Sequence, residues 1–326
     1  MTILTQMSMI FRRFVLNDAK GDMLDDLLLE YDDSLRGGAY AVYSNDDSRP
    51  RNKFSGGEMN TTIGVSKFIK MLPITMRLQR SFDESIKLAG KPHDSEYVRD
   101  VSMAEQIKNI AKEIGAEAVG FTDVTPDVIF SGKDVPYKYA VVVAMRMSNE
   151  KIATAPSVDC MMEVSNTYGL LGVLVNKLSD RIIELGYDAV PGPALGGAVD
   201  YPSLARKAGL GEYGRHGLLI SPFNGACQRI AAVFTNIELP VEEPNPYEWV
   251  RDFCAKCGKC IKACPSKAIR EEPVSTKDGH YSCVIHEDCL SYFGKNYGCS
   301  VCIKECPFTE QGYDKIKKAF LPNNMK

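Results

Sequence analysis

The sequence predicts a mixed α/β (α+β) fold, in which a core domain is followed by a small cysteine-rich domain. Two observations predict it. Segments with helical and strand patterns alternate through the middle of the chain, and nine of the eleven cysteines lie between Cys254 and Cys306. The 326 residues suffice for one large domain and a smaller one. We therefore divide the chain into an N-terminal covering region (1–95), a core (96–245) and a C-terminal domain (246–326).

The predicted core begins with an amphipathic helix. Ser102 and Glu105 fit a capping box, apolar residues recur at helical spacing from Met103 to Ile114, and Gly115 is expected to end the helix. The later predicted elements are strands over 118–122, 139–145 and 230–235 and a long helix over 166–185.

The flanking regions are less regular. Residues 44–58 are polar and predict a loop within the covering region, for which the sequence indicates no chemistry. Three prolines between Pro240 and Pro246 predict a stiff boundary before the C-terminal domain.

Composition excludes several classes of protein. The net charge of -3 argues against a nucleic-acid binder, which usually carries a basic excess. No apolar run approaches the roughly 18 residues of a membrane span. Arg12-Arg13 resembles the start of a twin-arginine export signal, but the charged residues between Phe14 and Asp26 leave no apolar stretch after it. We therefore expect a cytoplasmic protein.

The cysteine spacing predicts two 4Fe-4S clusters. Disulfides are the alternative, but a chain of this length does not need them and the cysteines are clustered. Cys254-x2-Cys257-x2-Cys260-x3-Cys264-Pro265 is the ferredoxin-type run, in which the fourth cysteine binds the other cluster. A second run is Cys289-x9-Cys299-x2-Cys302-x3-Cys306-Pro307. Two such endings in one domain make zinc a poor alternative.

The fourth cysteine of each run binds the cluster of the other run, and this exchange defines two ligand sets. Cluster 1 is expected to take Cys254, Cys257, Cys260 and Cys306, and cluster 2 to take Cys289, Cys299, Cys302 and Cys264. Cys283 competes with Cys289 for one position, and the spacing alone does not choose between them.

Lysines interleave the predicted ligands. Cations beside an anionic cluster favour its reduced form and suit an acidic electron donor, such as a ferredoxin or flavodoxin. A merely solvated basic face is an equal alternative. These lysines are Lys256, Lys259, Lys262, Lys267 and Lys304.

A glycine-rich loop from Gly209 to Gly214 matches G-x-G-x-x-G. In a dinucleotide-binding fold this motif follows a strand and opens a helix. Here residues 201–208 have a helical pattern and 217–221 an extended one, which is the reverse order. The loop therefore argues against nicotinamide or flavin binding, although its glycines still indicate a backbone that closely approaches another group.

The chain resembles the cobalamin-dependent reductive dehalogenases over roughly residues 100–310. Motif order and spacing agree with that family. The last cysteines also match it, which favours Cys289 over Cys283 as a ligand. The matching segments are residues 208–220 and 229–235, Ala155-Pro156-Ser157, Asn166-Thr-Tyr168, Leu185-Gly-Tyr187, Cys289-x2-Tyr-Phe293 and residues 298–308.

The resemblance implies a nitroreductase-like core that binds a corrinoid base-off, without a protein ligand to cobalt. Tyr168 matches the family's catalytic tyrosine, and Arg229 matches the arginine beside it. A protonated phenol can supply the proton of a reductive cleavage, and a guanidinium stabilises the phenolate left behind. The implied cofactor-binding residues are Gly209, Leu210, Gly211, Tyr213, Gly214 and Arg215.

Epoxyqueuosine reductases share this cobalamin fold and both clusters, but usually carry tryptophan and lysine in the glycine loop. Residues 191–197 depart from the dehalogenases in offering only small or apolar side chains, and the missing export signal departs from the respiratory ones. Asp200 is a second candidate acid. We therefore expect a reductive dehalogenase. The alternatives are another cobalamin-dependent reductase acting on a modified tRNA base, an iron–sulfur electron carrier without cobalamin, and a flavin or nicotinamide reductase.

Overall fold

The structure is a computed structural model. It describes residues 43–44, 63–91, 93, 95–130, 133–240, 246–275 and 281–324.

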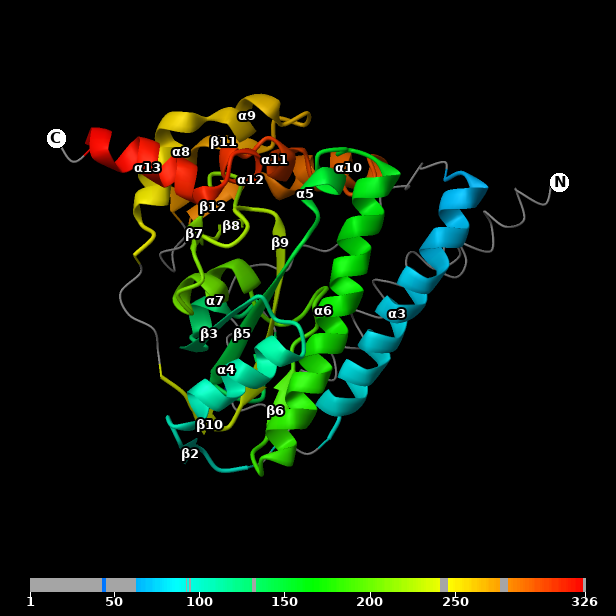
Figure 1. Cartoon of the computed structure of the whole chain (residues 1–326), viewed down its shortest axis with the longest axis vertical. Coiled ribbons are helices and arrows are strands. Elements are labelled where there is room, and N and C mark those ends of the chain that lie inside the picture. The colour runs from blue at the N-terminus through cyan, green and yellow to red at the C-terminus, as the bar shows by residue number, and fades with distance from the viewer. Residues whose placement is uncertain are drawn as a thin grey trace.

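A four-stranded sheet lies at the centre of the molecule, and all of its neighbouring strands are antiparallel (Figure 1). In spatial order its strands are β3 (Ala118–Asp123), β5 (Tyr139–Arg146), β9 (Gln228–Thr235) and β6 (Ala189–Pro191). The three strands predicted from β-branched runs are confirmed.

The antiparallel pairing makes the core α+β. Between β3 and β5 the described residues hold a short 3-10 helix (Pro126–Val128) and β4 (Asp134–Val135), and among them there is no crossover helix of the kind that a parallel pair needs. The long helix α6 (Val158–Glu184) connects β5 to β6, which are not neighbours in the sheet. Helices and strands alternate along the chain, but the sheet that they build is antiparallel and not parallel.

Helices cover both faces of the sheet. Val141 and Val143 of β5 pack with α6 and α4 (Met103–Glu113) in one apolar cluster. Val142, the residue between them, packs on the opposite face with Leu204 of α7 (Tyr201–Lys207). This alternation is the period of two expected of a strand buried on both sides.

The predicted helix that begins near Ser102 is confirmed as α4, but the capping box is wrong. Ser102 has helical backbone angles, and its side chain makes no cap to the helix. Its hydroxyl donates instead to Asp100 Oδ1, 2.5 Å away. The helix ends at Glu113, and Gly115 follows with φ +114°.

The helix predicted over 166–185 begins earlier, at Val158. Ser157 caps it, because its hydroxyl accepts a hydrogen bond from the Cys160 N–H at 3.1 Å. α6 therefore reaches back toward the C-terminal domain.

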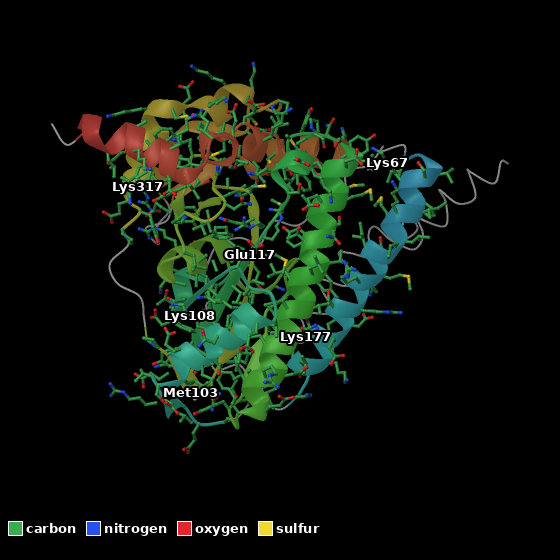
Figure 2. The ribbon with its side chains drawn as sticks, in the orientation of Figure 1. Lys67, Met103, Lys108, Glu117, Lys177 and Lys317 are labelled. Atoms are coloured by element: carbon green, nitrogen blue, oxygen red, sulfur yellow. The ribbon has the colours of Figure 1, made fainter. Side chains whose placement is uncertain are left out.

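Helix α3 (Val65–Ala89) lies along α6 (Figure 1). The two backbones approach closely, since a Cβ placed on Gly172 would be 2.6 Å from Ser81 Oγ. Asn176 of α6 donates to the Ser81 carbonyl oxygen at 2.8 Å. Lys67, labelled in Figure 2 near the N-terminal end of α3, pairs with Asp159 at 2.7 Å. Within the predicted loop over 44–58, only Ser44 is described. It belongs to β1 (Tyr43–Ser44), which pairs with β4; residues 45–58 lie outside the described residues.

The C-terminal domain packs at the N-terminal end of α6, beside α5 (Asn149–Ile152) (Figure 1). It consists of α8 (Trp249–Cys257), α9 (Lys259–Ala263), β11 (Ile269–Ser275), β12 (Tyr281–Val284), α10 (His286–Lys295), α11 (Val301–Lys304), α12 (Pro307–Glu310) and α13 (Tyr313–Asn324).

Two small pairs of strands complete the fold. β7 (Glu212–Tyr213) and β8 (Leu219–Ile220) are antiparallel, while β10 (Ile237–Glu238) and β2 (Val98–Arg99) are parallel. The predicted helix–glycine loop–strand order around residues 201–221 is thus confirmed. Among the described helices, none is long and apolar enough to cross a membrane.

Candidate functional site

The structure brings together the four cysteines assigned to cluster 1. The Cys254 thiol interacts electrostatically with Cys306, Cys260 and Cys257. Gly258 adopts a left-handed conformation between α8 and α9 and turns the chain there. Burial raises the pKa of Cys254 to about 12 and that of Cys260 to about 11. Thiolates at this site therefore require a bound cation, which iron supplies.

The cysteines assigned to cluster 2 form a second group. Burial raises the pKa of Cys302, which interacts with Cys299, Cys289 and Cys264 of this group and also with Cys260 of the first group. Burial alone would also raise the pKa of Cys264, but hydrogen bonds from Ser266 and the Ala268 N–H outweigh it, and the pKa is lowered. Two separate sets of four thiols suit two cubane clusters.

Cys283 lies apart from both groups. Its electrostatic neighbours are Arg215 and Arg251, and its Cβ is 3.8 Å from the position of a Cβ added to Gly217. The structure thus places Cys289, rather than Cys283, beside Cys299. Within the described residues, no three histidine, cysteine or acidic side chains converge as ligands of a single metal ion. The assignment of the eight ligands stays a prediction.

Tyr168 and Arg229 meet where α6 crosses the beginning of β9. The guanidinium carbon of Arg229 lies 4.8 Å from the centroid of the Tyr168 ring. Both side chains are half-buried, and Nε of Arg229 has no hydrogen-bond partner among the described residues. The arginine therefore contacts the face of the ring, an attractive cation–π arrangement.

Cys160 connects this pair with the cluster 2 cysteines. The thiol is fully buried in the first turn of α6, where it interacts with the side chain of Ser300 and with Cys299 and Arg229. Burial raises its pKa, while Ser300 and Arg229 act to lower it. Tyr168 follows eight residues later, about 12 Å along the helix axis. Sequence reasoning missed this contact, because a single cysteine outside the motifs gives no signal.

Asp200, the second candidate acid, lies beside the glycine loop. Its Oδ2 accepts hydrogen bonds from the Ser203 hydroxyl at 2.5 Å and from the Tyr213 hydroxyl at 2.9 Å. The first bond lies within the start of α7, and the second joins α7 to β7, so the carboxylate helps to hold the glycine loop.

Gly211 lies close to the backbone of a neighbouring strand. A Cβ added to this glycine would overlap the carbonyl oxygen of Ile220 in the neighbouring strand β8, so the close approach is to the chain's own backbone. At Gly214 a Cβ would meet the His216 ring at 2.6 Å. Leu210 is buried in the core, and Gly209 has φ +69°. Their role in binding a cofactor stays a prediction.

Glu212 joins the core to the C-terminal domain. Its carboxylate is fully buried, and Oε1 accepts from Nε of Arg206 at 2.7 Å and from Nε of Arg251 in α8 at 3.0 Å. Arg215, also predicted to bind the cofactor, makes a second link by donating from Nη1 to the Glu271 carbonyl oxygen at 2.6 Å.

Two buried hydrogen-bond donors suit a large polar cofactor such as a corrinoid. Nε of Arg229 and Nε2 of His216 are buried without hydrogen-bond partners among the described residues, and such donors are usually satisfied in native proteins. A cofactor rich in amide groups supplies acceptors of the required kind.

The chain is similar to known iron–sulfur proteins and reductases. Residues 253–309 match the family described as the 4Fe-4S dicluster domain. The tetrachloroethene reductive dehalogenase of Desulfitobacterium hafniense is 33% identical over 210 residues, which cover 60% of this chain and 37% of the relative. The epoxyqueuosine reductase of Aliivibrio fischeri is 33% identical over 150 residues, covering 42% of this chain and 37% of the relative. The chain thus spans less than half the length of these curated relatives.

Solved structures show the same fold. One is a catabolic reductive dehalogenase, with a TM-score of 0.65 and 20% identity over 82% of this chain and 44% of that one. Another is the reductive dehalogenase described as suggesting a mechanism for B12-dependent dehalogenation, with a TM-score of 0.66 and 21% identity over 83% of this chain and 42% of that one. At these identities the similarity establishes the fold.

Proposed function

Because this chain is related to the cobalamin-dependent reductive dehalogenases, we propose that it is a corrinoid and iron–sulfur reductase that removes a halogen from an organic substrate. In the overall reaction, two electrons and one proton convert a carbon–halogen bond into a carbon–hydrogen bond and release halide. The observation that carries the proposal is the contact between Tyr168 and Arg229 at 4.8 Å.

Tyr168 is the proposed proton donor. A phenol is protonated at neutral pH and is therefore available as an acid. Loss of the proton leaves a phenolate, and the cation of Arg229 over the ring stabilises that negative charge. Because both side chains are half-buried, this attraction is stronger than it would be in open water.

The corrinoid, when bound, supplies the cobalt-centred electron chemistry of the reductive step. The residues proposed to hold it are Gly209, Leu210, Gly211, Tyr213, Gly214 and Arg215. In this chain they lie in one segment that includes strand β7, fixed at Tyr213 by Asp200 and at Arg215 by the Glu271 carbonyl. The loop therefore presents a rigid edge to the cofactor.

Electrons are proposed to reach the corrinoid through the two clusters. Cys160, on the helix that carries Tyr168, contacts Ser300 and Cys299 beside cluster 2, and the backbone of Arg215, a proposed corrinoid-binding residue, contacts the Cys254 thiol of cluster 1. Lys256, Lys262 and Lys267, which interleave the predicted ligands, are exposed. They form a basic surface suited to an acidic donor of the ferredoxin or flavodoxin type.

Two of the five interleaved lysines are engaged by other groups of the protein. Lys259 pairs with Glu310 at 2.7 Å, and Lys304 donates to the Ala155 carbonyl oxygen at 3.2 Å. We therefore assign the donor-binding role to the three exposed lysines.

The test is anaerobic reconstitution with iron, sulfide and cobalamin, followed by reaction with a panel of aryl and alkenyl halides under a chemical reductant. Stoichiometric halide release with the dehalogenated product is expected. A bound corrinoid without halide release from any member, but with reduction of an epoxyqueuosine-containing RNA, would instead support the epoxyqueuosine-type activity that the Aliivibrio relative favours. An ultraviolet–visible spectrum that shows iron–sulfur bands alone after reconstitution would contradict both.

A further inference from the structure

His216 occupies a tight turn between β7 and β8. The Gly217 N–H donates to the Gly214 carbonyl oxygen at 2.9 Å, and Gly217 has φ +75°, so the turn is fixed by its glycines. The imidazole is 4% exposed, and its Cε1 edge packs so closely on Gly214 that a Cβ there would be 2.6 Å away. The ring is therefore held in one orientation.

One hydrogen bond determines the tautomer of this imidazole. The Leu218 N–H donates to Nδ1 of His216 at 3.2 Å, so Nδ1 is an acceptor. Burial lowers the pKa of His216 to about 4, which keeps the ring neutral at neutral pH. The single ring proton is consequently on Nε2, because a neutral imidazole has one donor N–H and one acceptor nitrogen.

Nε2–H is thus a buried donor, and in the described part of the chain nothing accepts its hydrogen bond. Leaving such a donor unsatisfied costs free energy. The cost disappears if a group bound between the core and the C-terminal domain supplies an acceptor.

The residues on either side of His216 both contact the C-terminal domain. The backbone of Arg215 hydrogen-bonds to the Cys254 thiol of the cluster 1 set. A Cβ added to Gly217 would lie 3.4 Å from Val284 Cγ2. Ile220, which packs beside the ring, belongs to the same apolar cluster as Cys306, a second member of that set. The imidazole is therefore positioned at the boundary where the proposed cofactors bind.

We propose that His216 donates a hydrogen bond from Nε2 to an acceptor atom of a prosthetic group, either a sulfur of cluster 1 or an amide oxygen of the corrinoid. The contact of Arg215 with Cys254 favours the cluster sulfur. The inference rests on the cofactors of the proposed function and does not depend on the substrate.

The first test replaces His216 by Leu and by Gln in protein that is reconstituted with iron and sulfide only. An N–H···S bond stabilises the additional negative charge of a reduced cluster, so its loss favours the oxidised form. Potentiometric titration followed by electron paramagnetic resonance should show at least a threefold rise in the oxidised-to-reduced ratio of one cluster for His216→Leu, about 28 mV for a one-electron couple. His216→Gln keeps a donor and should recover most of the difference.

The second arm measures cobalamin affinity of the same variants. Unchanged cluster potentials together with a cobalamin Kd raised at least tenfold would identify the corrinoid as the acceptor. If neither quantity changes in His216→Leu, the proposal is wrong.

His93→Leu is the matched control. His93 is equally buried, but its two ring nitrogens have partners, Asp188 Oδ1 at 3.3 Å and the Leu88 carbonyl oxygen at 3.1 Å. Its loss should lower stability and leave both readouts unchanged. If His216→Leu fails to fold, wild-type protein labelled with ¹⁵N-histidine remains: a weak ¹⁵N coupling to a reduced cluster or to Co(II) supports the bond, and the absence of both contradicts it. Because no substrate is used, a failure of dehalogenation leaves this test intact.

Discussion

The guanidinium carbon of Arg229 lies over the face of the Tyr168 ring, 4.8 Å from its centroid, although 61 residues separate the two in the sequence. The contact joins the beginning of β9 to the middle of α6. Because the arginine covers the ring rather than extending past it, the hydroxyl of Tyr168 can be removed without disturbing this packing.

Tyr168→Phe is expected to keep both clusters and the corrinoid and yet to lower the rate of the proton-dependent step. A positioned general acid contributes roughly 100- to 10,000-fold in rate, or about 3 to 5 kcal/mol. Single-turnover kinetics with a substrate that wild-type protein dehalogenates measure the loss. Tyr187→Phe is the control, because it removes a hydroxyl that is bonded to Asp100 instead. A wild-type rate in Tyr168→Phe would reduce the tyrosine to a packing residue and make Asp200 the next acid to test.

Arg229→Lys should lose less activity than Arg229→Met. Lysine retains the positive charge but lacks the planar guanidinium that lies over the ring, whereas methionine fills similar space without charge. The same single-turnover assay ranks the three proteins. Equal losses in the lysine and methionine variants would indicate that shape, and not charge, is what Arg229 contributes.

The cysteine groups predict separate effects on the two clusters. Anaerobic wild-type protein should contain about eight iron and eight acid-labile sulfides per chain, four of each for every cluster. Cys264→Ala should damage cluster 2 and spare cluster 1, because Cys264 lies with Cys289 and Cys299. Cys283→Ala should retain all the iron, since its neighbours are arginines. Iron analysis and electron paramagnetic resonance measure both variants; zinc in place of iron, or iron loss in Cys283→Ala, would overturn the assignment.

Glu212→Gln should destabilise the contact between the core and the C-terminal domain. The carboxylate is fully buried, but Arg206 and Arg251 are about one-third exposed, so the cost should fall between those of surface and buried pairs, roughly 2 kcal/mol. Thermal unfolding followed by circular dichroism measures it. Glu117→Gln removes a more exposed pair with Arg146 and should cost less. Equal melting temperatures for the two variants would count against the domain-joining role.

Gly211→Ala should destabilise the fold even without a cofactor. The added Cβ would overlap the Ile220 carbonyl oxygen, so β7 and β8 must separate. Chemical denaturation of cofactor-free protein should show a clear loss, whereas Gly64→Ala, with nothing within 4 Å of the new Cβ, should not. A Gly211→Ala protein of normal stability that binds cobalamin poorly would instead indicate that Gly211 approaches the corrinoid.

Local sequence patterns predicted the helices, the strands and the cysteine ligand sets. They did not predict how segments that are distant in the sequence pack together. The strands around Val142 and Ala232 follow from β-branched and apolar runs, and the ligand sets follow from cysteine spacing, because both are short-range properties. The antiparallel order of the sheet depends on contacts between distant segments. Ser102 was misassigned because its hydroxyl had a nearer acceptor in Asp100. The burial of His216 and Cys160 likewise depends on the packing of the C-terminal domain against the core, which no local pattern encodes.

The close packing of α3 on α6 limits which segments can be exchanged between this protein and its relatives. Ser81 packs so closely on Gly172 that a Cβ at position 172 would clash with the Ser81 hydroxyl oxygen. The Asn176 amide also donates to the Ser81 carbonyl oxygen. If residues 96–245 alone were transferred into a relative, Gly172 and the Asn176 amide would face a helix of the relative in place of α3. Any exchange of the core between homologues must therefore carry α3 with it, so that helix and core are inherited as one unit.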